Sequence, residues 1–346
     1  MSLSRPARIP LLKLPWLCIE CVTRNCDAFD IIFFALTSKK TRRIVKSFNI
    51  SLNGIRISVS EMSSIWLGGF SKVWFFIEPS LKSSFETNSR EIPLMFRNNP
   101  IPLCTSRTNN ALISYTHRNT MNALRMAMEF LNKVFKCSVE RVNIGGDNFP
   151  ESGDIGVKST GNLCIDQRIS PPFGYAQSQK IKLLLENLEV TGTCTFDVTN
   201  TEKDFYVDPK LIKCKKLMIP SGSAVWVTRE MLLQYEVPRL TFFGRPISVE
   251  DILSFVTHWF HSDNKKFEYL HIGFRARQFS WEAFQDLNPL PFNERNRIPP
   301  SGSIGEIDFS KGLEIVRHDG LQATIHANNW RVLFYIWHDQ SAITQS

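Results

Sequence analysis

The feature that most restricts the fold of this chain is a short helical segment that is apolar on every side. It spans positions 29–36 and includes the following apolar residues: Phe29, Ile31, Ile32, Phe34, Ala35 and Leu36. A helix without a polar face has to be buried all round, and a run this short falls far below the ~20 residues needed to cross a bilayer. We therefore expect this segment to form the centre of a packed helical module and not to span a membrane.

Two further helical patterns flank this segment, so that residues 14–48 predict three short helices. The first opens with Pro15, where a missing backbone N–H costs nothing, and the second can be capped by Asp27. The third begins at Ser38 and turns apolar residues inward: Ile44, Val45 and Phe48. The apolar face of the first helix consists of Leu14, Leu17, Cys18, Cys21 and Val22. The basic residues that the third helix carries outward are Lys39, Lys40, Arg42, Arg43 and Lys46.

After the third helix the pattern changes to the alternation typical of strands, followed by one long helix. Apolar residues alternate over 55–59 and again over 73–77, which predicts a small strand meander. Residues 97–118 mix Asn, Pro and Ser without periodicity, so we expect a loop there. The helix that follows has an apolar stripe at steps of three and four: Met121, Leu124, Met128, Leu131 and Phe135.

The second half of the chain shows a weak internal rhythm of short strand cores. An apolar pair with one residue between its members recurs at five places: Val142 and Ile144, Leu188 and Val190, Leu217 and Ile219, Leu240 and Phe242, and Leu270 and Ile272. The last four pairs are 29, 23 and 30 residues apart, a period typical of leucine-rich-repeat solenoids, in which each unit is a strand with a helical return. Thr228 and Ser248 can cap two of these helices. Residues 159–180 break the rhythm, and we interpret them as a degenerate unit or an insertion.

Patterns at the C-terminal end predict how the sheet is completed. Residues 291–305, which include PPSGS, indicate a linker or turn. Asp319-Gly320 predicts a hairpin with a two-residue turn, because Gly accepts the positive backbone angles of such a turn, and residues 332–337 predict a last strand. The expected fold is mixed α/β: an N-terminal three-helix module, then a leucine-rich-repeat-like α/β domain closed by a C-terminal β-hairpin and strand.

Composition favours an ordered protein of a reducing compartment. Hydrophobic residues make up 43% and charged residues 21% of the 346 residues, which is far from the composition of disordered chains. The eight cysteines are too sparse for a disulfide scaffold, and Pro10, Lys13 and Pro15 interrupt any signal-peptide core. We expect the protein in the cytoplasm, the nucleus or both.

The net charge of +8 leaves two kinds of partner open, because much of it lies in the third helix. An acidic protein partner would explain the basic residues of that helix. Nucleic acid is the alternative, with the same residues facing phosphates. No recognition-helix pattern accompanies the charge, so we expect a protein partner and neither nucleic acid nor a membrane.

No motif in the sequence indicates catalysis, a cofactor or a metal. Cys18 and Cys21 form C-x-x-C, but no second pair follows nearby. His258 and His261 lie three positions apart without a third ligand at a known spacing. The stretches GGD (145–147) and SGS (221–223) lack the other residues of a nucleotide-binding turn or a nucleophile elbow. We expect a non-enzymatic protein without cofactor or metal.

The three-helix segment resembles the F-box consensus without a gap. Leu14-Pro15 matches its opening Leu-Pro, residues 31–36 its central apolar helix, and Ser38-Lys39 the pair that opens its third helix. The second half looks like the type 2 F-box-associated domain in three segments: SVERVNI (138–144), VEDILSFVTHWFHSDNKKFEYLHI (249–272) and GLEIVRHDGLQATIHANNWRVLFYIWH (312–338). This resemblance implies an F-box at 9–50, a connecting region of strands and loop at 51–120, and an F-box-associated domain at 121–340.

The resemblance further implies a substrate-recognition subunit of a Skp–cullin–F-box ubiquitin ligase that performs no chemistry itself. The F-box would bind the Skp adaptor, which links it to cullin and RING subunits, and the C-terminal domain would bind target proteins that the sequence does not identify. By position, the expected adaptor interface consists of Pro10, Leu11, Leu14, Pro15, Ile19, Val22, Ile31, Leu36, Ser38 and Lys39. Two alternatives stay open: a three-helix cap that needs no partner, and an interaction module whose F-box-like segment no longer binds the adaptor.

Overall fold

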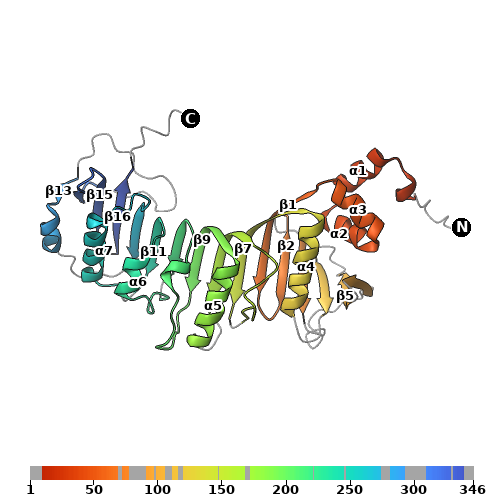
Figure 1. The fold of residues 1–346 in the computed structure, drawn as a ribbon, viewed down its shortest axis with the longest axis horizontal. Helices are drawn as coiled ribbons and strands as arrows, with labels where there is room; N and C mark the ends of the chain where they lie inside the picture. The colour runs from red at the N-terminus through yellow and green to blue at the C-terminus, as the bar shows by residue number, and fades with distance from the viewer. Residues whose placement is uncertain are drawn as a thin grey trace, which may run out of the picture. The chain divides into compact units, whose positions relative to one another are not determined.

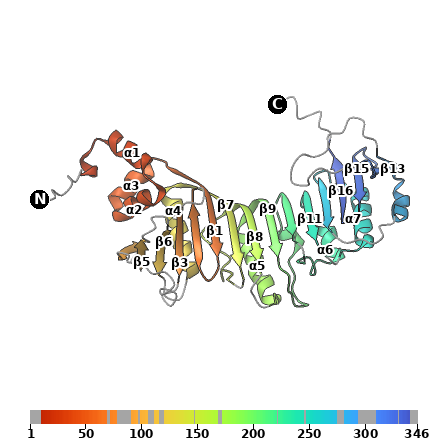
Figure 2. The ribbon, with the colours of Figure 1, turned by 180° about the vertical axis from the view of Figure 1, so that it is seen from behind.

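The chain divides into two compact units, and each is described by itself. The computed structural model describes residues 10–68, 72–77, 91–96, 99–105, 111–115, 120–146, 148–167, 172–220, 222–244, 247–273, 281–292, 309–328 and 330–338. The first unit comprises Met1–Arg141 and Ile155–Val157, and the second comprises Val142–Asp154 and Lys158–Ser346. Figures 1 and 2 show the elements from opposite sides.

The first unit opens with the three expected helices, preceded by a single 3-10 turn, η1 (Leu11–Lys13). These helices are α1 (Trp16–Asn25), α2 (Ala28–Thr37) and α3 (Lys39–Ser47). The predicted cap at Asp27 is confirmed, because its side chain accepts a hydrogen bond from the Asp30 backbone N–H; Ser38, where the third helix was expected to begin, forms a capping box with Thr41. The expected burial of α2 on every side is met only in part, because Ile32 and Ala35 are fully enclosed but Phe34 and Leu36 are half-buried.

Seven strands and one long helix complete the first unit. The strands are β1 (Ser51–Val59), β2 (Ser63–Leu67), β3 (Lys72–Ile77), β4 (Glu91–Phe96), β5 (Asn99–Thr105), β6 (Ala111–Tyr115) and β7 (Lys136–Gly145). They lie side by side in the order β7-β1-β2-β3-β6-β5-β4, and the boundary with the second unit falls within β7. Helix α4 (Thr120–Val134) contacts β2 and β3 and buries the middle of the stripe predicted for it, with Leu124, Met128 and Leu131 completely enclosed. Met121 is half-buried, and Phe135 is buried just beyond the end of the helix.

The loop expected at residues 97–118 is a correction, because β5 and β6 lie within it. Strand β6 pairs in parallel with β3 and antiparallel with β5. Its residues Leu112, Ile113 and Ser114 are buried. The apolar run of β6 is too short to show a period, and its strand character comes from β3, which is remote in sequence. Residues 97–98, 106–110 and 116–118 of the expected loop lie outside the described residues.

The second unit is built on five parallel strands that neighbour one another in chain order. They are β8 (Ser159–Asp166), β9 (Glu189–Asp197), β10 (Lys216–Ile219), β11 (Arg239–Phe243) and β12 (Tyr269–Gly273). The connections carry α5 (Tyr175–Asn187), the 3-10 turn η3 (Pro209–Leu211), α6 (Arg229–Gln234) and α7 (Val249–His261). Helices α5, α6 and α7 lie on one face of this sheet (Figure 1). The expected caps at Thr228 and Ser248 are confirmed.

The buried ladder of these strands corrects the spacing predicted from the sequence. Leu163, Cys194, Leu217, Leu240 and Leu270 stand in register, 31, 23, 23 and 30 residues apart. The centre of β9 is therefore Cys194 and Phe196, whereas Leu188 caps the end of α5. Residues 159–180 are neither an insertion nor degenerate, because they contain β8 and the start of α5.

The last strands of the second unit are antiparallel. They are β13 (Leu290–Pro291), β14 (Leu313–Val316), β15 (Gln322–Ala327) and β16 (Arg331–Trp337), with η4 (Trp281–Leu287) before them. The final strand does not form an edge, because β16 pairs with β12 on one side and β15 on the other. Residues 293–305 of the expected linker lie outside the described residues, as do Asp147 and Ser221 of the two glycine-containing stretches.

The predicted hairpin joins β14 and β15, but its turn has three residues instead of two. Arg317 N–H donates to Leu321 O over 2.9 Å, and Gly320 N–H donates back to Arg317 O over 2.9 Å. The turn therefore holds His318, Asp319 and Gly320, and Gly320 has φ of 84°. A positive φ at the third residue is the geometry of a three-residue hairpin with a bulge, so Gly320 is the third residue of the turn and not the second.

Candidate interaction surfaces

The first candidate surface is the outward side of α1, here called the α1 face: Leu17, Cys18, Cys21 and Val22. Leu17 exposes 77% of its surface and Val22 exposes 43%, and both cysteine thiols are free and exposed. Next to this face Trp16 is 49% exposed, and Leu12 in η1 is 43% exposed. A row of large apolar side chains in water is costly, at roughly 25 cal/mol for each Å² left uncovered, and marks an interaction surface.

The side of α1 that faces α3 buries few residues, and its contacts hold the helix in this orientation. Ile19 is buried with Ile44 and Phe48 of the α3 region. The Trp16 ring lies 5.1 Å from that of Phe48, and the Arg24 guanidinium donates to Phe48 O over 2.6 Å. Among the residues of α1, only Ile19 and Thr23 are buried.

This arrangement changes what the apolar pattern of the first helix means. The sequence placed five residues on one apolar face: Leu14, Leu17, Cys18, Cys21 and Val22. The structure turns the last four to solvent, whereas Leu14 is half-buried and packs against the cluster of Ile19, Ile44 and Phe48. The helix can bury its other side because the Thr23 hydroxyl donates to Ile19 O over 2.7 Å, which satisfies the polar group. The pattern therefore identifies a face left uncovered within the described chain.

The residues expected at the adaptor interface occupy three environments. Pro10, Pro15, Val22, Ser38 and Lys39 are exposed, Leu11, Leu14 and Leu36 are half-buried, and Ile19 and Ile31 are buried. In this conformation Ile19 and Ile31 pack inside the helical module, and Ser38 caps α3. Three exposed residues were left out of the expected interface, namely Leu12, Trp16 and Leu17. Leu17 could have been found from the sequence, because it shares the apolar face of Val22.

The outward side of α3 is strongly basic. Lys39, Lys40, Arg43 and Lys46 are exposed. Arg42 is half-buried instead, with its guanidinium 5.2 Å from the centre of the Phe130 ring. The helix contains no acidic residue, so its positive charge is available to an acidic partner.

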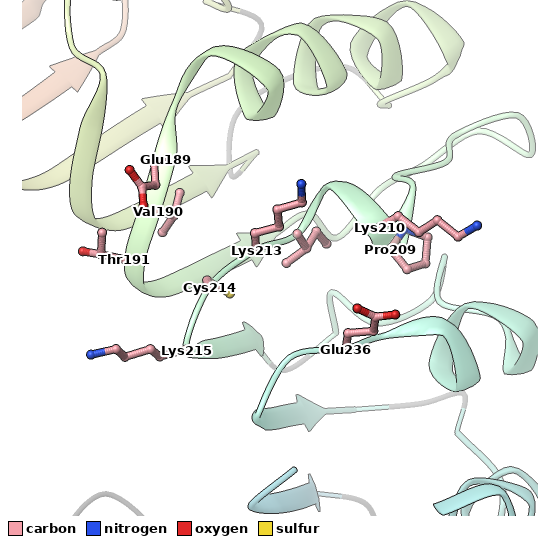
Figure 3. Close-up of a pocket in the computed structure, with 10 residues that line it drawn as sticks. Glu189, Val190, Thr191, Pro209, Lys210, Lys213, Cys214, Lys215 and Glu236 are labelled. Atoms are coloured by element: carbon pink, nitrogen blue, oxygen red, sulfur yellow. The ribbon is translucent and has the colours of Figure 1, made fainter. Parts of the chain in front are cut away.

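The second candidate surface is a groove at the amino ends of β9, β10 and β11, here called the lysine groove (Figure 3). Its volume is about 680 Å³. Val190, Pro209 and Ile212 are buried and form its apolar floor. Three exposed lysines of one short stretch extend from it: Lys210, Lys213 and Lys215. Two further charged residues, Glu189 and Glu236, stand on the flanking elements.

Backbone contacts hold the lysine-bearing stretch in place. The Asp208 side chain caps η3 by accepting a hydrogen bond from Lys210 N–H over 3.0 Å. Lys215 N–H donates to Gly192 O in β9 over 2.9 Å. Gly192 is required here, because a Cβ atom at this position would lie 2.4 Å from Gly161 O of β8. The lysines are therefore presented by a fixed backbone.

The lysine groove continues in both directions along the same edge of the sheet. A hollow of about 330 Å³ shares Glu189, Val190 and Lys213 with it and extends towards Lys158. Another of about 290 Å³ shares Lys210 and Glu236 with it and extends towards His258. Cys214 also lines the groove, and burial raises the pKa of its thiol to about 11, so it is protonated at neutral pH.

The face of the second unit's sheet opposite the helices carries a titratable histidine. His271 of β12 lies with its ring 5.3 Å from that of Phe243. Burial, followed by the positive charges of Arg331 and Lys216, lowers the pKa of His271 to about 4. His271 is therefore neutral at physiological pH.

We predict that this histidine makes the second unit less stable in mild acid. Because the folded state holds His271 neutral while an unfolded chain protonates it below about pH 6.5, stability falls as the pH drops from 6.5 towards 4. The expected loss is about 1–2 kcal/mol between pH 7 and pH 5. Urea unfolding at both pH values checks this, and the His271→Gln variant should lose less stability over the same interval. An equal loss in both proteins would show that other groups cause the pH dependence.

The structure does not gather the possible metal ligands seen in the sequence. Across the described residues, no three or more His, Cys, Asp or Glu side chains converge as a metal site. None of the helices in the described part of the chain is long and apolar enough to cross a membrane.

Two family models match this chain, one over its first three helices and one within the second unit. A family model described as "F-box domain" matches residues 11–53, which hold η1, the three helices and the start of β1. A second model, described as "F-box associated", matches residues 210–272, from the lysine groove to β12. The first match contains the α1 face, and the second contains the three lysines of the lysine groove but not Glu189, Val190, Thr191 or Pro209.

One curated relative is similar over part of its length. It is a protein of Caenorhabditis elegans titled "Uncharacterized protein F59B2.8", 29% identical over 109 residues, which is 30% of this chain. The aligned region spans 25% of that relative's own length. No solved structure matches this chain.

Proposed function

Because the chain contains an F-box domain at residues 11–53 and an F-box-associated domain at residues 210–272, we propose that it is the substrate-recognition subunit of a Skp–cullin–F-box ubiquitin ligase. F-box domains generally bind Skp-type adaptors. The first unit would bind the adaptor, and the second unit would bind proteins that are to be ubiquitinated. The two family matches and the uncovered α1 face support this assignment.

The chain's contribution to ubiquitination would be proximity and not chemistry. Families of this kind are typically non-catalytic adaptor subunits. A RING subunit at the far end of the complex recruits the ubiquitin-conjugating enzyme, and holding a target near it raises the effective concentration of the reacting groups. This role requires no cofactor and no metal from the chain.

The observation that carries the proposal is the α1 face. A three-helix module of this size has little core of its own, and α1 buries only Ile19 and Thr23. Covering Leu17, which is 77% exposed, would stabilise a complex by roughly 1.5–3 kcal/mol. We infer that the adaptor covers the α1 face together with the exposed Leu12 and Trp16.

The expected interface residues keep distinct roles in this proposal. The exposed ones, Pro10, Pro15, Val22, Ser38 and Lys39, would contact the adaptor directly, together with half-buried Leu11, Leu14 and Leu36. Ile19 and Ile31 would act from inside the module by holding α1 and α2 in position. The basic face of α3 would attract an acidic surface on the adaptor.

The extent of the second domain and the place of action also remain proposals. We propose that the F-box-associated domain covers residues 121–340 and that its parallel strands and helical returns form a leucine-rich-repeat-like array. The regular register of Leu217, Leu240 and Leu270 supports this. We further propose that the protein acts in the cytoplasm, the nucleus or both.

The test is co-purification with a Skp-type adaptor. The wild-type chain should form a stable pair with the adaptor, and Leu17→Asp should weaken that pair about tenfold to a hundredfold, because a charge would replace an apolar contact in a desolvated interface. Leu183→Asp is the matched control, since Leu183 is also an exposed leucine on a helix (38% exposed) but lies in the second unit. Thermal unfolding of both variants verifies that they fold.

The same experiment distinguishes the runner-up function. An interaction module with a non-functional F-box predicts that the folded wild-type chain does not bind the adaptor at all. If a folded, monomeric wild-type chain shows no binding, or if Leu17→Asp and Leu183→Asp behave alike, the proposed role of the α1 face is lost.

A further inference from the structure

The lysine groove has the position and the charge of a docking site for part of another protein. We propose that it binds an acidic segment of the proteins that this chain recruits, with carboxylates of that segment pairing with Lys210, Lys213 and Lys215. This inference rests on the proposed function, because it names the chemistry of the target. It extends the proposal from the adaptor side to the substrate side.

The positive charge of the lysine groove is not neutralised by ion pairs within the described structure. Lys210, Lys213 and Lys215 come from one stretch of chain and are exposed. Within the described structure none of these three lysines forms a salt bridge, although Glu189 and Glu236 line the same groove. The carboxylates stand on flanking elements, and the three lysine side chains extend in different directions from one stretch of chain (Figure 3). A partner with acidic side chains would supply the missing counter-charges.

The lysine groove is elongated and has an apolar floor. The groove joins two neighbouring hollows along the edge of the sheet, so it offers an elongated surface and not a closed cavity. The buried side chains of Val190, Pro209 and Ile212 give it an apolar base. An elongated surface with an apolar base and a charged rim suits a peptide segment in which an apolar side chain is flanked by acidic ones.

A peptide fits this site better than a nucleic acid. None of the described residues that line the lysine groove is aromatic, and the aromatic residues that line a neighbouring hollow, Tyr235, Phe255, Trp259 and Phe267, are buried, so bases have no exposed Phe, Tyr or Trp ring to stack on. Glu189 and Glu236 would repel a uniformly charged phosphate backbone. A peptide can place its carboxylates beside the lysines and its neutral residues beside the glutamates.

The test measures binding of fluorescein-labelled peptides to the full chain by anisotropy at low salt. In the acidic probe, Glu residues flank a central Leu; the two comparison probes carry Gln or Lys in their place. We expect saturable binding of the acidic probe that weakens with added salt. The triple variant Lys210→Glu, Lys213→Glu and Lys215→Glu should bind it at least about tenfold more weakly, while replacement of all three by Arg should preserve binding.

The matched control reverses the same amount of charge at exposed lysines that line neither the groove nor the basic face of α3: Lys133→Glu, Lys203→Glu and Lys311→Glu. This control should bind the acidic probe as the wild type does. Equal weakening in the two triple variants, equal or tighter binding of the Gln or Lys probe, or displacement of the acidic probe by single-stranded DNA at lower concentration than by unlabelled peptide would overturn the proposal. Thermal unfolding of the groove variant verifies that its fold is retained.

Adaptor co-purification with the same variants separates this inference from the proposed function. If the groove variant binds the adaptor but the wild type fails to bind the acidic probe, only the groove inference is lost. If the wild type binds the acidic probe but never the adaptor, the ligase function is lost and the groove remains a peptide site.

Discussion

Replacing Arg317 with Met is expected to lower the free energy of unfolding of the second unit by roughly 1.5–3 kcal/mol. The Arg317 side chain is completely buried and makes a two-pronged ion pair with Asp319, with N–O distances of 2.8 and 2.9 Å. It also donates to Asn264 O over 3.0 Å, and its guanidinium lies 4.9 Å from the centre of the Trp259 ring. One side chain therefore ties the β14–β15 turn to the end of α7.

The loss is expected because Arg317 is buried and satisfies several groups at once. Hydrogen bonding to Arg317 is the main reason that the pKa of Asp319 lies well below its usual range. Without the guanidinium, the Asn264 carbonyl loses its side-chain donor and the Trp259 ring loses its cation contact. Asp319, in contrast, keeps the hydrogen bond from Leu321 N–H and the contact with Lys265. Methionine fills much of the volume, so the change reports mainly on the polar interactions.

Arg239→Met is the control for this prediction. Arg239 pairs with Glu268 at the surface, where the two side chains are 45% and 37% exposed. An exposed pair of this kind contributes about 0–1 kcal/mol, because water and salt screen it. Urea unfolding of the full chain, with hydrogen exchange to assign the transition to the second unit, measures both variants. Similar losses from Arg317→Met and Arg239→Met would mean that burial of Arg317 does not make it important.

The helical part of the first unit was predictable because its signals are local. Asp27 and Ser38 accept hydrogen bonds from backbone N–H groups three residues ahead, so each cap depends only on residues that are close together in the sequence. The apolar residues of α2 and α3 follow the helix period in the same way. The direction of the α1 face could not be predicted, because the apolar stripe does not show that α1 buries only Ile19 and Thr23 against the rest of the module.

The sequence predicts that strands recur in the second unit, but it does not predict which residues form the centre of each strand. Leu188 and Val190 match the apolar-x-apolar pattern, yet the strand centre is Cys194 and Phe196. Position 188 is apolar because it ends a helix and is buried there. Two elements that meet at one position share its hydrophobic residue, so the pattern alone cannot say to which element it belongs.

The lysine groove could not be predicted because none of its parts indicates a binding site by itself. The stretch 210–216 reads as a solvated, lysine-rich connection. It becomes a groove only where the parallel strands bring it beside Val190 from β9 and Glu236 from the connection before β11. Candidate sites made from several connections depend on strand order, which is a long-range property of the fold.

Trp74→Ala is expected to destabilise the first unit by about 3–5 kcal/mol. Trp74 of β3 is fully buried and stacks on Phe76, with ring centres 5.3 Å apart. Its indole Nε1–H donates to the Ser114 hydroxyl of β6 over 2.9 Å, and both groups are enclosed. Removing the ring would leave a large cavity beside β2 and strip Ser114 of its donor.

Comparison with Ser114→Ala separates the ring from its hydrogen bond. That variant keeps the ring but leaves the indole N–H without its partner, at a cost of about 1–3 kcal/mol. Hydrogen exchange should show the smaller change concentrated in β6 and the larger one spread over β2, β3 and β6. Because β6 has no strand period of its own, we attribute its presence in the sheet to this contact with β3. Protection of β6 that survives Trp74→Ala would show instead that the backbone pairing with β3 and β5 is sufficient.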